Sequence, residues 1–563
     1  MPTANEMRAR ADGPFDLLII GGGITGAGAA RDAARRGLKV CLVEQEDLAS
    51  GTSSRSSKLV HGGLRYLENL EFALVFEAVS ERRVLTEIAP HLVAPMGFLF
   101  PVYKRSRRSV FTVNLGMWVY DGLSLFRSPR IHQNLGAKAV AEVEPMLGQD
   151  GLKGAPLYWD CSTDDARLTL ESALDAVSQG AVVLTWTKVT GLLHNDQGRV
   201  SGVKVRDQLS GEEREISANA VINATGPWSD KTRQLSAPAA AERLRPTKGV
   251  HIVVNASRLK VNHAVVCFHP TDGRVLFAIP WGEQTYIGTT DTDFEGDPTQ
   301  VCADRDDVRY LIAAANFYFP SAALTEGDVI ATWAGVRPLI GAEPAANESK
   351  VSREHEIRVD PDMLITIAGG KLTTYRRMAG EVVDQAVSLL MLAGKLPGEL
   401  RPPRTDREPL PGAVGWPESD DPAVLVQRAL AAGKGAIEEG TAKGLVHTYG
   451  TRAVDVAARA AEQQRLAARL CPHRDEIVAQ VDHAVQQELA ATLRDVLIRR
   501  TQVFFRDHLQ GLSAAPTVAA RMAELLGWDE ARTAAEIAAY TAEVELSRRW
   551  QTEVAQAPAE VAG

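Results

Sequence analysis

The sequence predicts an α/β fold that begins with a Rossmann-like nucleotide-binding unit, continues into an antiparallel sheet and ends in a helical domain. Three observations support this. A glycine turn joins an apolar strand to a helix near the N-terminus, β-type alternation fills the middle of the chain, and an alanine-rich helical pattern follows a proline-rich linker. At 563 residues the chain exceeds one hydrophobic core, and its length suggests about three or four units.

The glycine turn follows the apolar run at 17–20. Three glycines there have the G-x-G-x-x-G spacing: Gly21, Gly23 and Gly26. In such a turn the first glycine reverses the chain, the second lets the backbone approach a pyrophosphate, and the third packs the helix on the strand. A second apolar strand at 39–43 ends in Glu44, at the distance expected for a carboxylate that binds an adenosine ribose. A purely structural glycine corner is therefore less favoured, and the carboxylate favours FAD or NAD over NADP.

The composition excludes several other classes of protein. An apolar content of 45% with 24% charged residues is that of an ordinary globular protein, and no apolar segment approaches the ~20 residues that span a bilayer. The net charge of -9 argues against nucleic-acid binding. Five scattered cysteines without ligand spacing argue against a disulfide framework and a metal site, and favour a reducing cytoplasm. Residues 1–13 lack the apolar core of a secretory signal, and we expect a disordered lead-in.

A hydroxyl-rich loop at 51–58 follows Glu44 and is well supplied with donors for phosphate oxygens or a flavin ring. The plain alternative is a flexible serine loop. Its candidate cofactor contacts are Thr52, Ser53, Ser54 and Ser57. The segment 61–68 comes next, and its paired glycines would let a flat group lie against the backbone, beside a basic and an aromatic residue: Gly62, Gly63, Arg65 and Tyr66.

Together the glycine turn, the serine loop and segment 61–68 resemble the FAD-dependent glycerol-3-phosphate dehydrogenases, in the amino-acid-oxidase-like branch of two-domain flavoproteins. The resemblance covers 16–376 strongly and the remainder loosely. It implies an FAD cofactor, oxidation of sn-glycerol 3-phosphate to dihydroxyacetone phosphate, and electron transfer to a membrane quinone. It also implies a backbone contact to the adenine at Val189 and a second glycine turn near the cofactor at Gly226.

The implied architecture is a two-domain flavoprotein with a helical C-terminal addition. A β meander at 181–224 suggests a second wall of the nucleotide site, and strand-rich residues 248–298 suggest a substrate sheet over the flavin. The expected parts are a discontinuous FAD-binding domain (14–90, 155–245 and 330–395), a substrate domain (91–154 and 246–329), a linker (396–420) and a helical domain (421–563).

Oxidation of a secondary alcohol requires a flat hydride acceptor, a proton acceptor and an anchor for the substrate. Guanidinium groups hold a phosphate dianion best, and the family resemblance points to Arg65, Arg337 and Arg353. His251, in a β stretch, is the candidate base. A buried structural histidine is the ordinary alternative, and deprotonation assisted by Arg337 competes with both.

Residues 369–374 open a helix after a strand at 364–368. Positive charge there would stabilise the negative charge that develops on the flavin's pyrimidine edge during reduction, so Lys371 is assigned to catalysis, cofactor and substrate. A surface lysine in the first helical turn is the alternative. Other cofactor contacts expected here and near Arg337 are Gly335, Gly370, Leu372 and Thr373. Tyr66 and Thr374 are further candidate substrate contacts.

A quinone partner would require contact with a bilayer, so we expect peripheral attachment to the inner face of the cell membrane, with a homodimer left open. Residues 72–88 have helix spacing and predict a packing helix. Residues 110–126 predict either a core helix, which the residues alone favour somewhat, or an amphipathic surface segment. If the segment lies on the surface, the basic residues that precede it would form a cationic rim: Lys104, Arg105, Arg107 and Arg108.

Two rival functions remain. The related oxidase delivers electrons to oxygen, but those oxidases carry an insertion after the arginine-proline motif, and the segment 338–353 is short here. The other rival is a flavin-binding sensor or scaffold without turnover. Retention of the candidate catalytic and anchoring residues argues against it: Arg65, His251, Arg337, Arg353 and Lys371.

Overall fold

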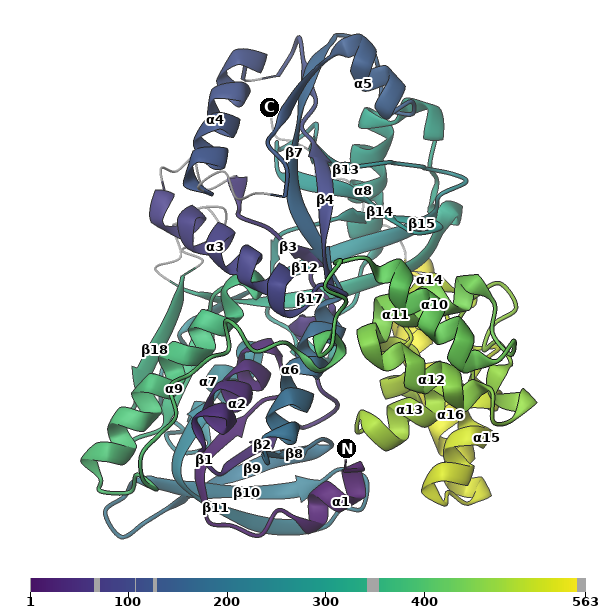
Figure 1. The fold of residues 1–563 in the computed structure, drawn as a ribbon. Helices are drawn as coiled ribbons and strands as arrows, with labels where there is room; N and C mark the ends of the chain where they lie inside the picture. The colour runs from purple at the N-terminus through teal and green to yellow at the C-terminus, as the bar shows by residue number, and fades with distance from the viewer. Residues whose placement is uncertain (1, 65–70, 107, 125–128, 342–353, 554–563) are drawn as a thin grey trace.

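The computed structural model describes residues 2–64, 71–106, 108–124, 129–341 and 354–553. In Figure 1 one sheet with its helices lies at the bottom, a second sheet lies above it, and a helical domain lies to the right. The predicted α/β fold with a second, largely antiparallel sheet and a helical C-terminal domain is confirmed.

The first sheet is Rossmann-like. Its parallel core runs in the order β8 (Val182–Leu184), β2 (Val40–Val43), β1 (Phe15–Ile20), β11 (Glu213–Asn223) and β19 (Ile365–Gly369), with β18 (His355–Val359) antiparallel at the edge. The predicted meander adds β9 (Thr187–His194) and β10 (Val200–Asp207). The helices that pack together with this sheet are α2 (Ile24–Arg36), α6 (Asp165–Ser178) and α9 (Tyr375–Leu392). The strands β1, β2 and β8 are buried almost along their whole length, as apolar runs without alternation predict.

The second sheet follows the order β16 (Thr292–Asp293), β12 (Leu244–Asn255), β15 (Gln284–Gly288), β14 (Val275–Trp281), β13 (Ala264–Phe268), β4 (Val93–Leu99), β7 (Leu152–Thr163) and β3 (Leu59–Val60). β17 (Val329–Ile340) pairs with β12, while β5 (Val102–Tyr103) and β6 (Gln133–Gly136) pair with β7. All these pairs are antiparallel except β4 with β13. The helices α5 (Ala137–Val143) and α8 (Arg305–Tyr318) belong to the same unit.

The long strands β7 and β17 both belong to the second sheet, where β7 pairs with β4 and β17 pairs with β12. Most of their residues nevertheless fall within the ranges expected for the FAD-binding domain. Each is 12 residues long and carries the chain between the two units. The expected domain limits near 155 and 330 stay a prediction.

The C-terminal domain is built from short helices: α10 (Pro422–Gly433), α11 (Glu439–Tyr449), α12 (Ala453–Ala460), α13 (Ala479–Gln487), a π-helical turn (Asp495–Arg500), α14 (Val503–Arg506), α15 (Ala515–Leu526) and α16 (Glu530–Arg548). Buried ion pairs join it to the first unit. The guanidinium of Arg167 on α6 pairs with Glu488 at 2.7 Å, and that of Arg500 donates to Asp47 at 2.8 Å. Because breaking a buried pair costs several kcal/mol, these contacts fix the helical domain in place.

The expectation of a disordered N-terminal lead-in is wrong. Helix α1 (Ala4–Ala9) forms there, closed by a capping box between Thr3 and Glu6. Met7 is buried, and Arg8 forms an ion pair with Asp207 at the end of β10. The T-x-x-E pattern was the available signal for this helix.

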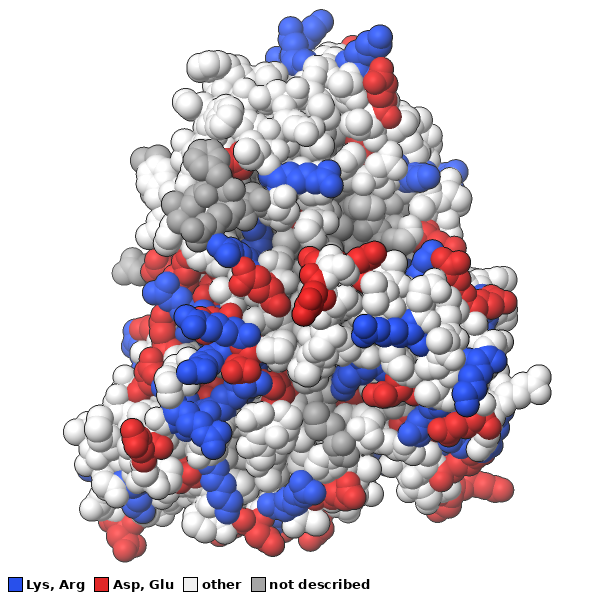
Figure 2. All heavy atoms as spheres, in the orientation of Figure 1, with Lys and Arg blue, Asp and Glu red and all other residues white. Residues whose placement is uncertain are grey.

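Two surface helices border the second sheet: α3 (Phe72–Ile88), which confirms the predicted packing helix, and α4 (Val110–Leu123). Figure 2 shows largely uncharged surface over α4, in the upper left of the view. Large apolar side chains of both helices are exposed to solvent: Phe72, Phe76, Phe111, Leu115, Trp118 and Val119. The amphipathic surface interpretation therefore replaces the core-helix interpretation for the described part of this segment. Among the described helices, none is long and apolar enough to cross a membrane.

Candidate active site

A cavity opens at the carboxyl ends of β1, β2 and β19, where ligands bind in sheets of this type. Ten of the predicted cofactor contacts line it: Gly21, Gly23, Glu44, Thr52, Ser53, Val189, Gly226, Gly370, Lys371 and Leu372. They come from the glycine turn, the serine loop, the meander and the start of α9, so the fold brings together segments that are far apart in the sequence.

The glycine turn has the tight packing that a dinucleotide site needs. Gly21 has φ of +108°, and a Cβ there would lie 2.6 Å from the carbonyl oxygen of Ala224. A Cβ on Gly26 would lie 1.9 Å from the carbonyl oxygen of Gly21, so α2 can start this close to β1 only with glycine. The N-terminus of α2 therefore lies beside the cavity, where its backbone dipoles would meet a pyrophosphate. These residues fit FAD.

Glu44 lies at the end of β2 and is 8% exposed. Its carboxylate accepts hydrogen bonds from the backbone N–H groups of Gly22 at 2.6 Å and Glu46 at 2.9 Å. Burial raises the pKa of Glu44 to about 7, although these two hydrogen bonds oppose the shift. Ribose hydroxyl groups would supply further donors to the ionised form.

We predict that Glu44→Arg weakens FAD retention without converting the site to nicotinamide chemistry. Because the ionised carboxylate is the better acceptor, FAD affinity should also rise with pH through about 7, and Glu44→Gln should remove this dependence. In the protein without FAD, the free energy of unfolding should change with pH in the opposite direction. Because folding raises the pKa of Glu44, the protonated carboxyl group stabilises the fold fully below pH 4.5, and this stabilisation is lost as the pH rises towards 7. The ratio of flavin to protein absorbance checks the first effect, and normal flavin content in Glu44→Arg would contradict the placement of the cofactor.

The serine loop is ordered by specific contacts. In the turn η1 (Thr52–Ser54), the hydroxyl oxygen of Ser53 accepts a hydrogen bond from Ile24 N at the start of α2, at 2.9 Å. The hydroxyl of Thr52 donates to the carbonyl oxygen of Val336 on β17 at 2.6 Å. The loop therefore connects the cofactor cavity to the second sheet.

The remaining predicted cofactor contacts do not line this cavity, and their cofactor roles stay predictions: Gly26, Ser54, Ser57, Gly62, Gly63, Gly335 and Thr373. The carbonyl oxygen of Ser54 accepts a hydrogen bond from Lys58 Nζ at 3.2 Å, and Gly62 N donates to Asp160 at 3.1 Å. A Cβ on Gly62 would lie 2.2 Å from the hydroxyl of Tyr120, so its close approach is to a side chain.

His251 lies on β12 and is 2% exposed. Its Nε2 lies 2.9 Å from the hydroxyl of Ser57, and its ring stacks on Trp333 of β17 at 4.7 Å between centroids. No described residue hydrogen-bonds to Nδ1. Burial, with the positive charges of Arg337 and Lys58, holds the pKa of His251 well below its usual value of 6.5. The imidazole is therefore neutral at physiological pH, as a proton acceptor must be.

Arg337 lies on β17, in the strand that pairs with β12. Its guanidinium donates to Asp291 Oδ1 at 2.9 Å, to the hydroxyl of Thr289 at 3.0 Å and to the carbonyl oxygen of Thr290 at 3.1 Å. The side chain stays 24% exposed, so a bound anion can still reach it. These contacts fix the orientation of the planar donor group.

Register places His251 and Arg337 on one face of the sheet. His251 pairs with Trp333, Gly249 with Gly335, and Thr247 with Arg337. A Cβ on Gly249 would lie 2.3 Å from Arg337 Nη2, and one on Gly288 would lie 2.1 Å from His251 Cδ2. Sequence analysis missed these two glycines and Trp333. Glycine within a β-type run was the available signal, because it often marks a close approach.

Lys371 lines the cavity at the start of the turn η8 (Leu372–Thr374), which leads into α9. Gly369 and Gly370 before it have φ of +75° and +85°, so both adopt the left-handed conformation that favours glycine. Thr374 is buried and does not itself line the cavity, but its hydroxyl contacts Lys371 O and Met378 Sδ, and both of these residues line it. Three predicted substrate contacts lie outside the described residues: Arg65, Tyr66 and Arg353.

Comparisons with known proteins identify the family of this chain. A family model described as FAD dependent oxidoreductase matches residues 16–376, and one described as the C-terminal domain of alpha-glycerophosphate oxidase matches residues 403–533. The aerobic glycerol-3-phosphate dehydrogenase of Staphylococcus haemolyticus is 39% identical over 92% of each chain, and that of Staphylococcus aureus strain USA300 is 38% identical over 94% of each chain.

Among solved structures, the glycerol-3-phosphate dehydrogenase of Bacillus halodurans in complex with FAD matches with a TM-score of 0.81 and 34% identity, over 99% of this chain and 100% of that one. The fold and the cavity thus define an FAD-dependent oxidoreductase with an added helical domain. The chain belongs to this family and, within it, to the group of the aerobic glycerol-3-phosphate dehydrogenases. The glycerophosphate oxidase of Mycoplasma pneumoniae shares the fold, with a TM-score of 0.52 at 19% identity over 70% of this chain and 98% of that one.

Proposed function

We propose that this protein oxidises sn-glycerol 3-phosphate to dihydroxyacetone phosphate and passes the electrons to a membrane quinone from the inner face of the cell membrane. One observation carries the proposal. A neutral, buried imidazole, His251, and an anchored guanidinium, Arg337, lie on the same face of the paired strands β12 and β17. Pro338, next to Arg337, lines the cofactor cavity. The names of the curated relatives support the choice of substrate.

In this mechanism the alcohol at C2 loses a hydride and a proton, and a carbonyl group forms. FAD, when bound, supplies a flat two-electron acceptor for the hydride. His251 accepts the hydroxyl proton at the imidazole, and its orphaned Nδ1 is the kind of buried atom that a bound molecule satisfies. Arg337 holds the substrate phosphate, and Lys371 places positive charge beside the cofactor cavity.

The experiment that tests this function uses the holoenzyme without oxygen. Adding sn-glycerol 3-phosphate should bleach the yellow flavin, and a soluble quinone should then restore the colour faster than oxygen does. Faster recovery with oxygen would favour the oxidase. An unbleached flavin in fully loaded protein would exclude turnover of this substrate and favour a binding protein.

The proposed membrane-binding surface comprises α3, α4 and the basic segment that precedes α4. Phe111, Leu115 and Trp118 are 78%, 58% and 53% exposed, and they follow one another at helical spacing along α4. Lys104, Arg105 and Arg108 are exposed in the segment that precedes α4, and Arg107 lies outside the described residues. An exposed apolar patch with a basic rim suits an anionic bilayer surface.

We predict that neutralising Lys104, Arg105, Arg107 and Arg108 together reduces cosedimentation with anionic vesicles. Each charge near such a surface contributes about 1 kcal/mol, and exchanging Phe111 and Trp118 for serine should lower binding further. A matched control neutralises four exposed basic residues elsewhere: Lys395, Arg428, Lys434 and Lys443. If the control and the first variant bind equally, this segment is not the anchor.

A further inference from the structure

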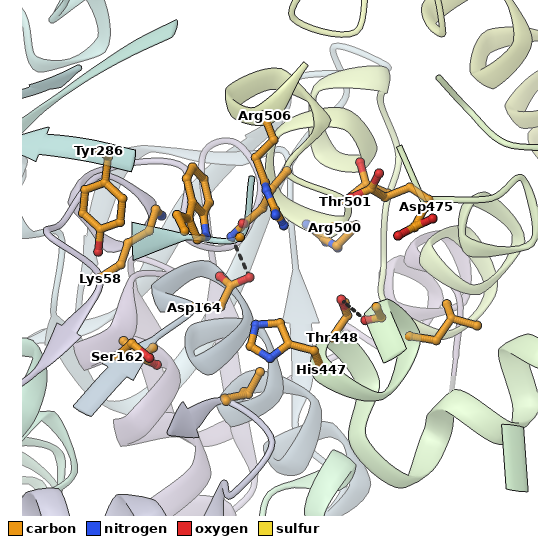
Figure 3. Close-up of a pocket in the computed structure, with 18 of the residues that line it drawn as sticks. Lys58, Ser162, Asp164, Tyr286, His447, Thr448, Asp475, Arg500, Thr501 and Arg506 are labelled. Atoms are coloured by element: carbon orange, nitrogen blue, oxygen red, sulfur yellow. Dashed lines mark hydrogen bonds between the residues drawn. The ribbon is translucent and has the colours of Figure 1, made fainter. Parts of the chain in front are cut away.

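A second cavity, of about 260 Å³, lies where the helical domain meets the second sheet. The loop that joins β7 to α6 and the β14–β15 hairpin form one side, while α11 and residues 500–506 form the other. Figure 3 shows the side chains of Asp164, His447 and Arg506 directed towards a common space, with Lys58 and Tyr286 to the left of it. The cavity is separate from the cofactor site, because the residues that line the two differ.

The acidic groups that line this cavity already have partners. Asp164 accepts hydrogen bonds from Gln502 Nε2 at 2.6 Å and from Arg167 N at 3.0 Å. Glu476 pairs with Arg474 at 2.7 Å, and Asp475 pairs with Arg469 at 3.1 Å. Glu476 and Asp475 are therefore neutralised by arginines, whereas the two hydrogen-bond donors to Asp164 are uncharged.

Among the basic groups, Arg506 differs from the others. Lys58 pairs with Asp165 at 2.7 Å, and Arg500 donates to Asp47 at 2.8 Å. In the described ranges of the chain, no carboxylate forms an ion pair with Arg506. Its Nε donates to Gln284 at 3.4 Å, a long hydrogen bond, and its two terminal nitrogens have no hydrogen-bond partner among these residues. Arg506 is therefore the cation of this cavity without a direct ion pair among the described residues, although Glu476, Glu283 and Asp164 attract its charge from a longer distance.

The neighbourhood of Arg506 has the form of a built site. Its guanidinium lies 5.1 Å from the ring centroid of Trp281, and a Cβ on Gly282 would lie 2.8 Å from its Nη2. Burial and the nearby charge of Arg474 lower the pKa of Arg506 to about 10, which still leaves it charged at neutral pH. His447 of α11 is exposed to solvent and lines the same cavity, and its imidazole can donate an N–H.

We propose that this cavity binds a small tetrahedral oxyanion of the phosphate type, held by the terminal nitrogens of Arg506 with a hydrogen bond from His447. A guanidinium offers two parallel donors to such an anion, and no ion pair among the described residues occupies the terminal nitrogens of Arg506. The anion would bridge the helical domain and the β14–β15 hairpin. Lys58 lies between this cavity and Trp333, at 5.4 Å from that ring, so the site lies close behind the aromatic ring that stacks on His251.

The test labels the arginines of wild-type holoenzyme with phenylglyoxal, in inorganic phosphate or in potassium chloride of equal ionic strength, and maps the modified peptides by mass spectrometry. At a phosphate concentration ten times its Kd, Arg506 should be labelled about tenfold more slowly. Arg428, exposed on α10, is the internal control and should be labelled equally in both salts. Equal labelling of Arg506 in the two salts would overturn the proposal.

A second measurement separates this site from the proposed substrate site and does not depend on access of the reagent. Phosphate should raise the Tm of Arg337→Gln above its value in chloride, because the second cavity is intact in that variant. The rise should disappear in the double variant Arg337→Gln/Arg506→Gln. A phosphate effect already absent from Arg337→Gln, or retained in the double variant, would contradict the assignment to Arg506.

Discussion

Replacing Arg337 by alanine is expected to lower kcat/KM for glycerol 3-phosphate by about 10- to 150-fold, because a charge-assisted hydrogen bond to the phosphate contributes roughly 1.5 to 3 kcal/mol. A charged three-carbon substrate offers little apolar surface, so such bonds must supply most of its binding. The contacts to Asp291, Thr289 and Thr290 aim the guanidinium before substrate arrives. Arg353→Ala is expected to give a loss of similar size.

Comparing glycerol 3-phosphate with glycerol distinguishes an anchor from a catalyst. Glycerol lacks the dianion and should be a poor substrate of the parent enzyme. If Arg337 only anchors phosphate, glycerol should lose little further activity in Arg337→Ala; a collapse would show that Arg337 assists departure of the hydroxyl proton. Arg245→Ala is the matched control, because this arginine also lies on the paired strands and forms an ion pair with Asp293 at 2.9 Å. Wild-type efficiency in both Arg337→Ala and Arg353→Ala would exclude this phosphate site.

The parts of the fold that the sequence predicted well have local causes. Gly21 and Gly26 mark the first strand and helix because backbone contacts there leave no room for a side chain. The helix at 72–88 followed from apolar spacing alone. The position of α4 could not be predicted in the same way, because the apolar side chains at 111–118 somewhat favoured a core helix, and only the neighbouring elements show that several of them are exposed.

The cofactor contacts were predictable from the sequence where a short motif supplies them, as the glycine turn and the serine loop do. The stacking of Trp333 on His251 depends on the register between two strands about 80 residues apart, which no local pattern encodes. The anchoring of Arg337 by Asp291 has the same origin. Ser57 was predicted as a cofactor contact, and its hydroxyl lies against His251, because the serine loop meets the second sheet as well as the cavity.

Replacing His251 by glutamine is expected to lower the rate of flavin reduction by about 10²- to 10⁴-fold, the usual contribution of a general base, while flavin content stays normal. His251 is suited to this role because burial, Arg337 and Lys58 keep its imidazole neutral, and Trp333 and Ser57 fix its ring. Anaerobic stopped-flow mixing with glycerol 3-phosphate measures the step directly. His269→Gln is the matched control, since that histidine directly follows β13 of the same sheet and also stacks on an aromatic ring, that of Tyr310 on α8 at 3.6 Å.

The pH dependence of the same rate gives an independent check. Because the pKa of His251 lies well below 6.5, the rate of flavin reduction by the wild type should not fall as the pH is lowered from neutral to 6.5. Arg337→Ala removes one of the charges that hold this pKa down, so the pKa of His251 should rise and the rate should begin to fall at a higher pH than in the wild type. A His251→Gln variant that reduces its flavin at nearly the wild-type rate would exclude His251 as the base and leave the deprotonation to a route assisted by Arg337.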